Sequence, residues 1–479
     1  MSEPSPQHPP PSPQHAPPRP AVPPTRPAAS PPQEPAAPPP SEPAAPPAQP
    51  AVPAYEAEPS FDAVPERARW RYKPRRLWRS KVVRATTVII VLALCALVIL
   101  ALVREQTGTQ GFLVGLGLAL LPVPLLMAAF RWLDRVDPGP WKNLLFAFAW
   151  GAFAAALVAI IANTFATRWI AVATADPASA DTIGATVVAP VVEESAKAAA
   201  ILLIFLFRRR DFTGLVDGVV IAGFTATGFA FTENILYLGN AFDEDQEFGT
   251  SGIESVTAAT FFVRIVLSPF AHPLFTVCTG IGFGIAAALA ARRGKVLRAL
   301  LPALGLLLAM GVHALWNGST TFGPWGFFAV YGAFMVPAFG LLTWLAVWTR
   351  QRELRTVSAE LPAYAAAGWL SPAEPLALAS MRARGMARDY ARRTFGPAAA
   401  RAVVEYETFA TSLAFLRHRA RRGAVGQDFA AREQELLHHL WQRKDVAGPS
   451  LTYAARAIGR VWTPPPHRDY GGYNPYRQR

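Results

Sequence analysis

The sequence predicts an all-α, polytopic membrane protein of about eight transmembrane helices. A disordered Pro-rich arm precedes them, and a small helical cytoplasmic region follows them. The 479 residues are 52% hydrophobic and only 16% charged, with a mean hydropathy of +0.21, which is apolar for a soluble globular protein. The apolar residues also gather in runs of roughly 20, the length of a helix that crosses a bilayer. A purely soluble enzyme is therefore excluded as the first interpretation.

Residues 1–66 are the predicted disordered arm. The first 65 residues contain 25 of the 46 prolines, and no apolar run there could build a core. Such an arm serves either as a tether or as a docking site for a domain that reads proline-rich peptides, and we favour the tether. Residues 67–84 follow as a basic juxtamembrane segment.

Eight apolar runs make up the predicted transmembrane domain, 85–348. The sixth run is too long for one straight span and contains Pro269, so we expect a tilt, a kink or an interfacial turn there. Cys95 and Cys278 both lie inside apolar runs, which excludes a disulfide framework and a cysteine metal site. The predicted spans are 85–103, 111–130, 144–162, 183–207, 215–238, 260–291, 296–316 and 327–348.

Residues 351–460 have apolar side chains at helical spacing, for example in 409–416 and 436–441, and form the predicted cytoplasmic helical region. This pattern fits either a small folded appendage or amphipathic helices that lie on anionic lipid. Residues 461–479, which include three consecutive prolines, are predicted to be a disordered tail.

The positions of Arg and Lys predict the orientation in the membrane. If 66–84 is cytoplasmic, every other basic loop and the tail after Arg350 lie on the same side, whereas the acidic loop 239–256 lies outside. We therefore expect a multi-pass plasma-membrane protein with both termini in the cytoplasm. The net charge of +13 is interpreted as attraction to anionic lipid at the basic segments, not to nucleic acid, because no nucleic-acid-binding module accompanies it. The excess of Arg over Lys, 40 to 6, indicates a bacterial source.

Ionisable side chains within the spans are the candidate functional residues, because a charge inside a bilayer is costly and usually marks a site. In the fourth span, Glu193 and Lys197 share one helix face, whereas Glu194 points about 100° away and stays free. In the sixth, Arg264, Ser268 and His272 should form one stripe at helical spacing. The candidate set on four spans comprises Glu193, Glu194, Lys197, Glu233, Asn234, Arg264, His272, His313 and Asn317.

Depth estimates at about 1.5 Å per residue place four side chains in the outer half of the bilayer, namely those of Glu194, Glu233, His272 and His313. A pocket open to the outside could hold them together with water. Three kinds of chemistry are then open: peptide hydrolysis by a carboxylate base, hydrolysis with bound zinc, or a proton relay in a transporter. Buried polar pairs that merely fix helix packing are the non-catalytic alternative, which a set spread over four spans disfavours.

Four motifs follow one another along the chain, each on its own span. They are Glu193-Glu194-x-x-Lys197, Gly228-Phe229-Ala230-x-x-Glu233-Asn234-x-x-Tyr237, Arg264 with His272-Pro273-Leu274-Phe275-Thr276, and His313-Ala314-Leu315-Trp316-Asn317. In this order they resemble the PrsW family of intramembrane proteases, over roughly 111–348. The resemblance implies a fold related to the CAAX prenyl endopeptidases and bacteriocin-processing enzymes. It also implies an endopeptidase that cuts a membrane-anchored protein, with anti-sigma factors as the substrate class.

The resemblance also implies the roles of individual residues. Glu193, Glu194, Glu233, His272 and His313 would be catalytic, and Lys197, Asn234, Arg264 and Asn317 would support them. A zinc ion, if used, would be held by Glu194, Glu233, His272 and His313. The chain has no His-Glu-x-x-His motif, and Lys197 would repel a cation, so a zinc-dependent and a metal-free mechanism both stay open. Within either, we expect Glu194 to activate water and Glu193 to pair with Lys197.

Two other functions use the same sequence features differently. A polytopic transporter or proton-coupled carrier would employ the ionisable residues as a relay, but such proteins often contain internal repeats, and the Glu-Glu motif occurs once. A membrane-anchored scaffold would use the Pro-rich arm and the basic tail, and it would not need charges inside the spans. Proteolysis is therefore the leading hypothesis.

Overall fold

The computed structural model describes residues 81–209, 211–289, 295–423 and 428–459. These residues are helical and contain no strand, which confirms the all-α prediction. The predicted arm 1–66, the predicted tail 461–479 and most of the basic segment 67–84 lie outside the described residues. The helices are α1 (Lys81–Leu120), α2 (Pro122–Leu133), α3 (Trp141–Ala149), α4 (Ala156–Thr174), α5 (Pro177–Ile183), α6 (Ala189–Phe207), α7 (Leu215–Phe248), α8 (Val256–Phe261), α9 (Ala271–Ala288), α10 (Lys295–Gly318), α11 (Gly323–Val330), α12 (Val336–Glu360), α13 (Pro362–Ala366), α14 (Glu374–Leu378), α15 (Met381–Phe395), α16 (Pro397–Arg421) and α17 (Phe429–Ala457).

Five stretches of the described residues are long and apolar enough to cross a membrane. They overlap seven of the eight predicted spans, because the first and the last stretch each overlap two. The predicted span 183–207 is not among them, and it is the one that carries Glu193, Glu194 and Lys197 close together. The number of eight crossings therefore stays a prediction. The five stretches are Ala85–Leu133, Trp141–Thr174, Leu215–Phe248, Val256–Ala288 and Lys295–Ala366.

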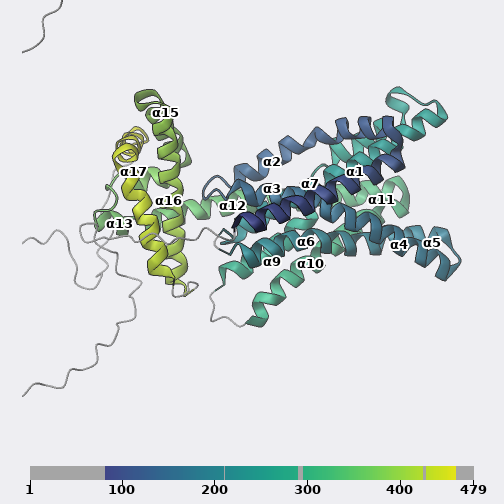
Figure 1. Ribbon diagram of the computed structural model, residues 1–479, viewed down its shortest axis with the longest axis horizontal. Helices are drawn as coiled ribbons and strands as arrows, with labels where there is room; N and C mark the ends of the chain where they lie inside the picture. Colours follow the sequence, from purple (N-terminus) through teal and green to yellow (C-terminus); the bar gives the residue numbers. More distant parts are fainter. Residues whose placement is uncertain (1–80, 210, 290–294, 424–427, 460–479) are drawn as a thin grey trace, which may run out of the picture. The chain divides into compact units, whose positions relative to one another are not determined.

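Helix α7 is the central element of the membrane helices (Figure 1). It packs against α1, α2, α3 and α9, and it is the most buried of the five apolar stretches. Glycine permits this close packing: a Cβ at Gly228 would lie 2.1 Å from the backbone oxygen of Phe148, and one at Gly218 would lie 2.1 Å from that of Gly280. The position of α7 therefore depends on residues without a side chain.

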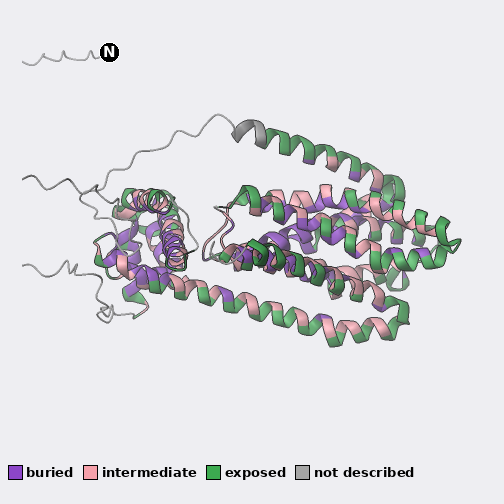
Figure 2. Ribbon diagram, turned by 90° about the horizontal axis from the view of Figure 1, so that it is seen from below, coloured by how far each residue is buried: buried purple, intermediate pink, exposed green. Residues whose placement is uncertain are grey.

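Large apolar side chains cover the outer faces of the membrane helices. Ile89 and Leu97 of α1 are 66% and 68% exposed, and Phe165 of α4 is 71% exposed. Figure 2 shows exposed residues along the outer sides of these helices and buried residues on their inner sides. Soluble monomers rarely expose apolar surface on this scale, so lipid is the expected contact, as in a multi-pass membrane protein.

The sixth predicted span is broken, as Pro269 led us to expect. A π-helical segment, Phe262–Leu267, continues α8 and ends at Ser268, and α9 begins at Ala271. The backbone N–H of Ser268 donates to the carbonyl of Val263 at 3.0 Å, and its hydroxyl donates to the same oxygen at 2.7 Å. The predicted continuous stripe of Arg264, Ser268 and His272 is therefore wrong, because the break places Arg264 and His272 on different helices.

The fifth predicted span is longer than expected. Helix α7 continues past 238 to Phe248, so the first part of the predicted loop 239–256 is helical. Asp245 stays near the end of this helix and accepts hydrogen bonds from the backbone N–H groups of Val256 and Thr257, both at 2.8 Å. This carboxylate joins the end of α7 to the start of α8.

The end of α12 and the helices α13 to α17 share an apolar core of their own. Tyr364 and Trp369 are among its largest buried side chains. Arg384 is also buried, and its guanidinium donates to the Leu378 carbonyl and to the Thr411 hydroxyl, both at 2.8 Å. This core favours a folded appendage over separate helices lying on lipid. Its location in the cytoplasm stays a prediction.

Candidate active site

Helix α6 carries three charged residues that contact one another. The Lys197 Nζ lies 2.8 Å from Glu194 Oε1 and 3.4 Å from Glu193 Oε2. Side chains three and four residues apart both face each other on a helix, so Lys197 reaches both carboxylates. The expectation that Glu194 stays free is therefore wrong, because it is the closer of the two partners of Lys197.

Glu194 is fully enclosed and is held from three helices. Its Oε1 lies 3.1 Å from Nδ1 of His313 on α10, and its Oε2 accepts a hydrogen bond from the Thr276 hydroxyl of α9 at 2.8 Å. Its exposed fraction is 0%, compared with 5% for Glu193. With both oxygens engaged, Glu194 is suited to fix its neighbours rather than to receive a water molecule.

The Glu193 carboxylate has more distant partners. Its Oε1 lies 3.4 Å from the Asn163 side-chain nitrogen on α4, and its Oε2 lies 3.9 Å from His313 Nε2. Contacts of this length are weak, so this carboxylate has the greater freedom to bind another group. Of the two adjacent glutamates, Glu193 is therefore the better placed to act on water or to hold a cation.

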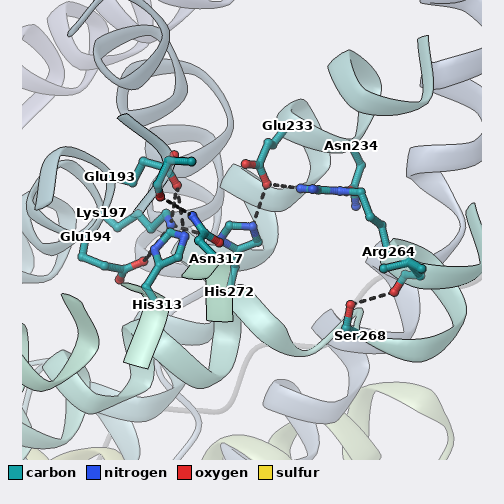
Figure 3. Close-up of polar contacts among 12 residues, drawn as sticks. Glu193, Glu194, Lys197, Glu233, Asn234, Arg264, Ser268, His272, His313 and Asn317 are labelled. Atoms are coloured by element: carbon teal, nitrogen blue, oxygen red, sulfur yellow. Dashed lines mark hydrogen bonds and ion pairs between the residues drawn. The ribbon is translucent and has the colours of Figure 1, made fainter. Parts of the chain in front are cut away.

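His272 connects α9 to both α6 and α7 (Figure 3). Its Nε2 lies 2.6 Å from Glu233 Oε2 on α7, and its Nδ1 lies 3.2 Å from the Lys197 Nζ. The same Lys197 ammonium lies 3.8 Å from the centroid of the Phe229 ring. The imidazole is thus held between a carboxylate on one side and an ammonium on the other.

Arg264 fixes the Glu233 carboxylate from the other side of the break before α9. Its Nη2 forms an ion pair with Glu233, and its Nε donates to Asn234 Oδ1 at 2.8 Å. Its guanidinium carbon also lies 3.8 Å from the centroid of the Tyr237 ring. Arg264 and Asn234 therefore support the partner of His272, which is an indirect role in the site.

Asn317 lies one helical turn after His313 and connects α10 to the approach to α6. Its side-chain nitrogen donates to the Ala185 carbonyl at 2.9 Å, within the π-helical segment Gly184–Val188 that precedes α6. Asn317 therefore fixes the relative placement of the helices that carry His313 and Glu193.

Thr276 and Asn163 contact the site without having been assigned a role from the sequence. Thr276 follows His272 by four residues on the same helix, so its proximity to the site could have been read from helical spacing. Asn163 is one of several polar residues of α4, and only the packing of α4 beside α6 brings it to Glu193.

The two carboxylates behind the imidazoles determine which ring nitrogens carry hydrogen. An ionised carboxylate only accepts hydrogen bonds, so His272 donates through Nε2 to Glu233 and His313 donates through Nδ1 to Glu194. His272 Nδ1 and His313 Nε2 are then left as bare nitrogens. One ligand atom from each of Glu193, His272 and His313 lies within 4.8 Å of the others, so these three residues are close enough to share one metal ion.

This donor set fits a zinc ion. Two neutral imidazoles, one carboxylate and one open position are typical of catalytic zinc sites, and a carboxylate behind a ligating imidazole is the usual supporting arrangement. The ligand set in the structure differs from the predicted one. Glu193 is the carboxylate ligand, whereas Glu194 and Glu233, which were predicted as ligands, contact the imidazoles of His313 and His272. The Lys197 ammonium contacts two of the three ligand residues.

Comparison with known proteins agrees with this chemistry. Residues 139–342, which include all of the catalytic candidates, match the model of a family described as PrsW family intramembrane metalloprotease. A protein named protease PrsW, from Clostridioides difficile (strain 630), is 30% identical over 164 residues, which are 34% of this chain and 62% of that protein. The chain thus matches less than two thirds of the length of that relative. No solved structure matches the chain significantly.

Proposed function

We propose that the protein is a membrane-embedded endopeptidase of the PrsW type, because residues 139–342 match the model of the PrsW family of intramembrane metalloproteases. The observation that carries the proposal is the convergence of Glu193, His272 and His313 from helices α6, α9 and α10, with a carboxylate hydrogen-bonded to each imidazole. A group of this kind delivers water to an electrophile. The family match favours a peptide carbonyl as that electrophile over a proton relay in a transporter.

In a metal-free enzyme, the Glu193 carboxylate would receive a proton from water while the water oxygen bonds to the carbonyl carbon of the scissile peptide. The proton then passes to the amide nitrogen as the C–N bond breaks, so that a carboxylic acid and an amine leave the site. Glu194 and Glu233 orient the two imidazoles, and Thr276 and Arg264 hold those carboxylates in place.

Glu193, His272 and His313 would hold the zinc ion of a metal-dependent enzyme, and zinc there would supply a more acidic water and polarise the carbonyl. The side chains supply the carboxylate and the ring nitrogens that this requires, and Lys197 contacts two of these three residues. The surrounding apolar helices exclude bulk water, which strengthens the electrostatic interactions among these groups.

The proposed substrate is a protein anchored in the same membrane, with anti-sigma factors as its class on the strength of the family resemblance. The proposed location is the bacterial plasma membrane, with both termini cytoplasmic. A site carried by membrane helices reaches peptide bonds within or beside the bilayer, which supports a membrane-anchored partner over a soluble one.

The proposal is tested by comparing cells that express the wild-type chain with cells that express Glu193→Gln or Glu194→Gln. New N-termini of membrane proteins are measured in each, so no substrate has to be known beforehand. We expect fragments that depend on the wild-type chain and disappear with both variants, while the variant proteins stay in the membrane at normal levels. Glu105→Gln on the exposed face of α1 is the matched control. Unchanged fragments with both site variants would contradict the proposed mechanism.

A further inference from the structure

Lys197 is a fully buried ammonium in the middle of the site. Its exposed fraction is 0%, and its three donor hydrogens have three acceptors: Glu194 Oε1 at 2.8 Å, His272 Nδ1 at 3.2 Å and Glu193 Oε2 at 3.4 Å. The Phe229 ring closes another side, with its centroid 3.8 Å from Nζ, in the geometry of a cation–π contact. The site therefore already surrounds one positive charge as a binding pocket would.

Two of these three acceptors are also the atoms that a metal ion would need. Glu193 and His272 belong to the group of three residues that could hold a metal, and the bare nitrogen of His272 is the one that faces Lys197. An ammonium and a zinc ion cannot share one lone pair, and two positive charges a few ångströms apart in a buried site repel strongly. A metal can bind here only if Lys197 gives up these two contacts.

We propose that Lys197 is a built-in cation that orders Glu193 and His272 when no metal is bound, and that competes with a metal ion for both of them. Glu194 provides the place to which the ammonium withdraws, because it is the closest partner of Lys197 and is not one of the three ligand residues. The long, flexible side chain of lysine permits such a shift while the buried ion pair with Glu194 stays intact.

This inference concerns metal binding and is tested without any cleavage assay, so it can fail while the proposed peptidase function stands. Purified full-length protein in detergent is dialysed against buffered free zinc at a series of concentrations, and the bound zinc per chain is measured. Lys197→Met keeps the length of the side chain and removes its charge. We expect this variant to bind zinc about tenfold or more tightly than the wild-type chain, because the competing charge is gone.

Lys142→Met is the matched control, since Lys142 is an exposed lysine of α3 outside the site, and it should bind zinc as the wild-type chain does. Lys197→Met leaves two buried glutamates without their cation and could unfold for that reason. A second pair of proteins, Glu194→Gln alone and Glu194→Gln combined with Lys197→Met, reduces this problem, because the neutral amide at position 194 leaves Glu193 as the one carboxylate that loses its contact with Lys197. Zinc should again bind more tightly to the member of the pair that lacks Lys197.

Equal or weaker zinc binding without Lys197, in either comparison between folded proteins, would overturn the inference. Absence of stoichiometric zinc from the wild-type chain and from every variant, at every concentration, would overturn it as well. That result would favour the metal-free form of the peptidase.

Discussion

The Glu233 carboxylate lies 2.6 Å from Nε2 of His272, on the opposite side of the imidazole from Lys197. This contact fixes the ring so that its other nitrogen, Nδ1, faces Lys197. Glu233 is itself held by the ion pair with Arg264. The fifth and sixth predicted spans thus meet at the site through the contact between Glu233 and His272.

Glu233→Ala should lower the cleavage rate by about 10- to 100-fold, which is the usual effect of removing a group that orients a catalytic imidazole. Glu233→Gln should lose less, because its amide oxygen still accepts a hydrogen bond from His272 Nε2. The measurement is the rate at which a membrane-anchored substrate is cut. Glu247→Gln, near the exposed end of the same helix, should cut at the wild-type rate. Equal activity of Glu233→Ala and the wild-type chain would show that Glu233 does not orient a catalytic imidazole.

The orientation of the chain is expected to follow its basic loops. A reporter that is active only outside the cytoplasm should be active when it is inserted between residues 249 and 255, in the turn between α7 and α8. The same reporter fused after residue 423, between α16 and α17, should be inactive. A cytoplasmic reporter should give the reverse pattern at both positions. The opposite result would show that the chain has the reverse orientation, and water would then be expected to enter the site from the cytoplasm.

Gly228→Ala is expected to destabilise the membrane helices by about 1–3 kcal/mol, the usual effect of forcing a methyl group into a packed interior. The new Cβ would lie 2.1 Å from the Phe148 backbone oxygen, which is too close for α7 and α3 to keep their spacing. Thermal unfolding of the purified protein in detergent measures the effect. Gly117→Ala on α1 is the control, since no atom lies within 4 Å of its added Cβ, and it should leave the unfolding temperature unchanged or slightly raised.

Asp134, just after α2, should make stability depend on pH. Burial and, second to it, the nearby Asp217 raise the pKa of its carboxyl from 3.8 to about 7, while Arg131 opposes the shift. Because the folded state holds the proton more tightly than the unfolded state, this group stabilises the fold most below pH 3.8. That contribution is lost progressively as the pH rises to about 7.

Asp134→Asn should remove this part of the pH dependence, because the amide oxygen can still accept from the Gly139 backbone N–H and cannot ionise. The free energy of unfolding, measured with denaturant between about pH 4 and pH 8, should therefore fall less steeply in the variant than in the wild-type chain. An identical slope in both proteins would show that Asp134 does not carry the effect.

Much of the site could be predicted because a bilayer makes ionisable residues conspicuous. Glu193, Glu194, Glu233, His272 and His313 stand out among apolar neighbours, and their places on four different spans indicated a shared site. Local spacing was less informative about their partners. Local spacing predicted that Lys197 pairs with Glu193 alone. Positions three residues apart on a helix are also neighbours, and Glu194 is the closer partner of Lys197 in the structure.

The sequence by itself determined the helical class, the apolar stretches, the break at Pro269 and the candidate residues for the chemistry, because these follow from composition and from short-range backbone constraints. Only the tertiary structure decided which carboxylate faces which imidazole. Glu194 contacts His313 and Glu233 contacts His272, while Glu193 has only a longer contact with His313. That division of roles depends on how α6, α7, α9 and α10 are rotated and spaced. Rotation and spacing are set by packing contacts between residues far apart in the chain, such as Gly218 against Gly280, which no local pattern contains.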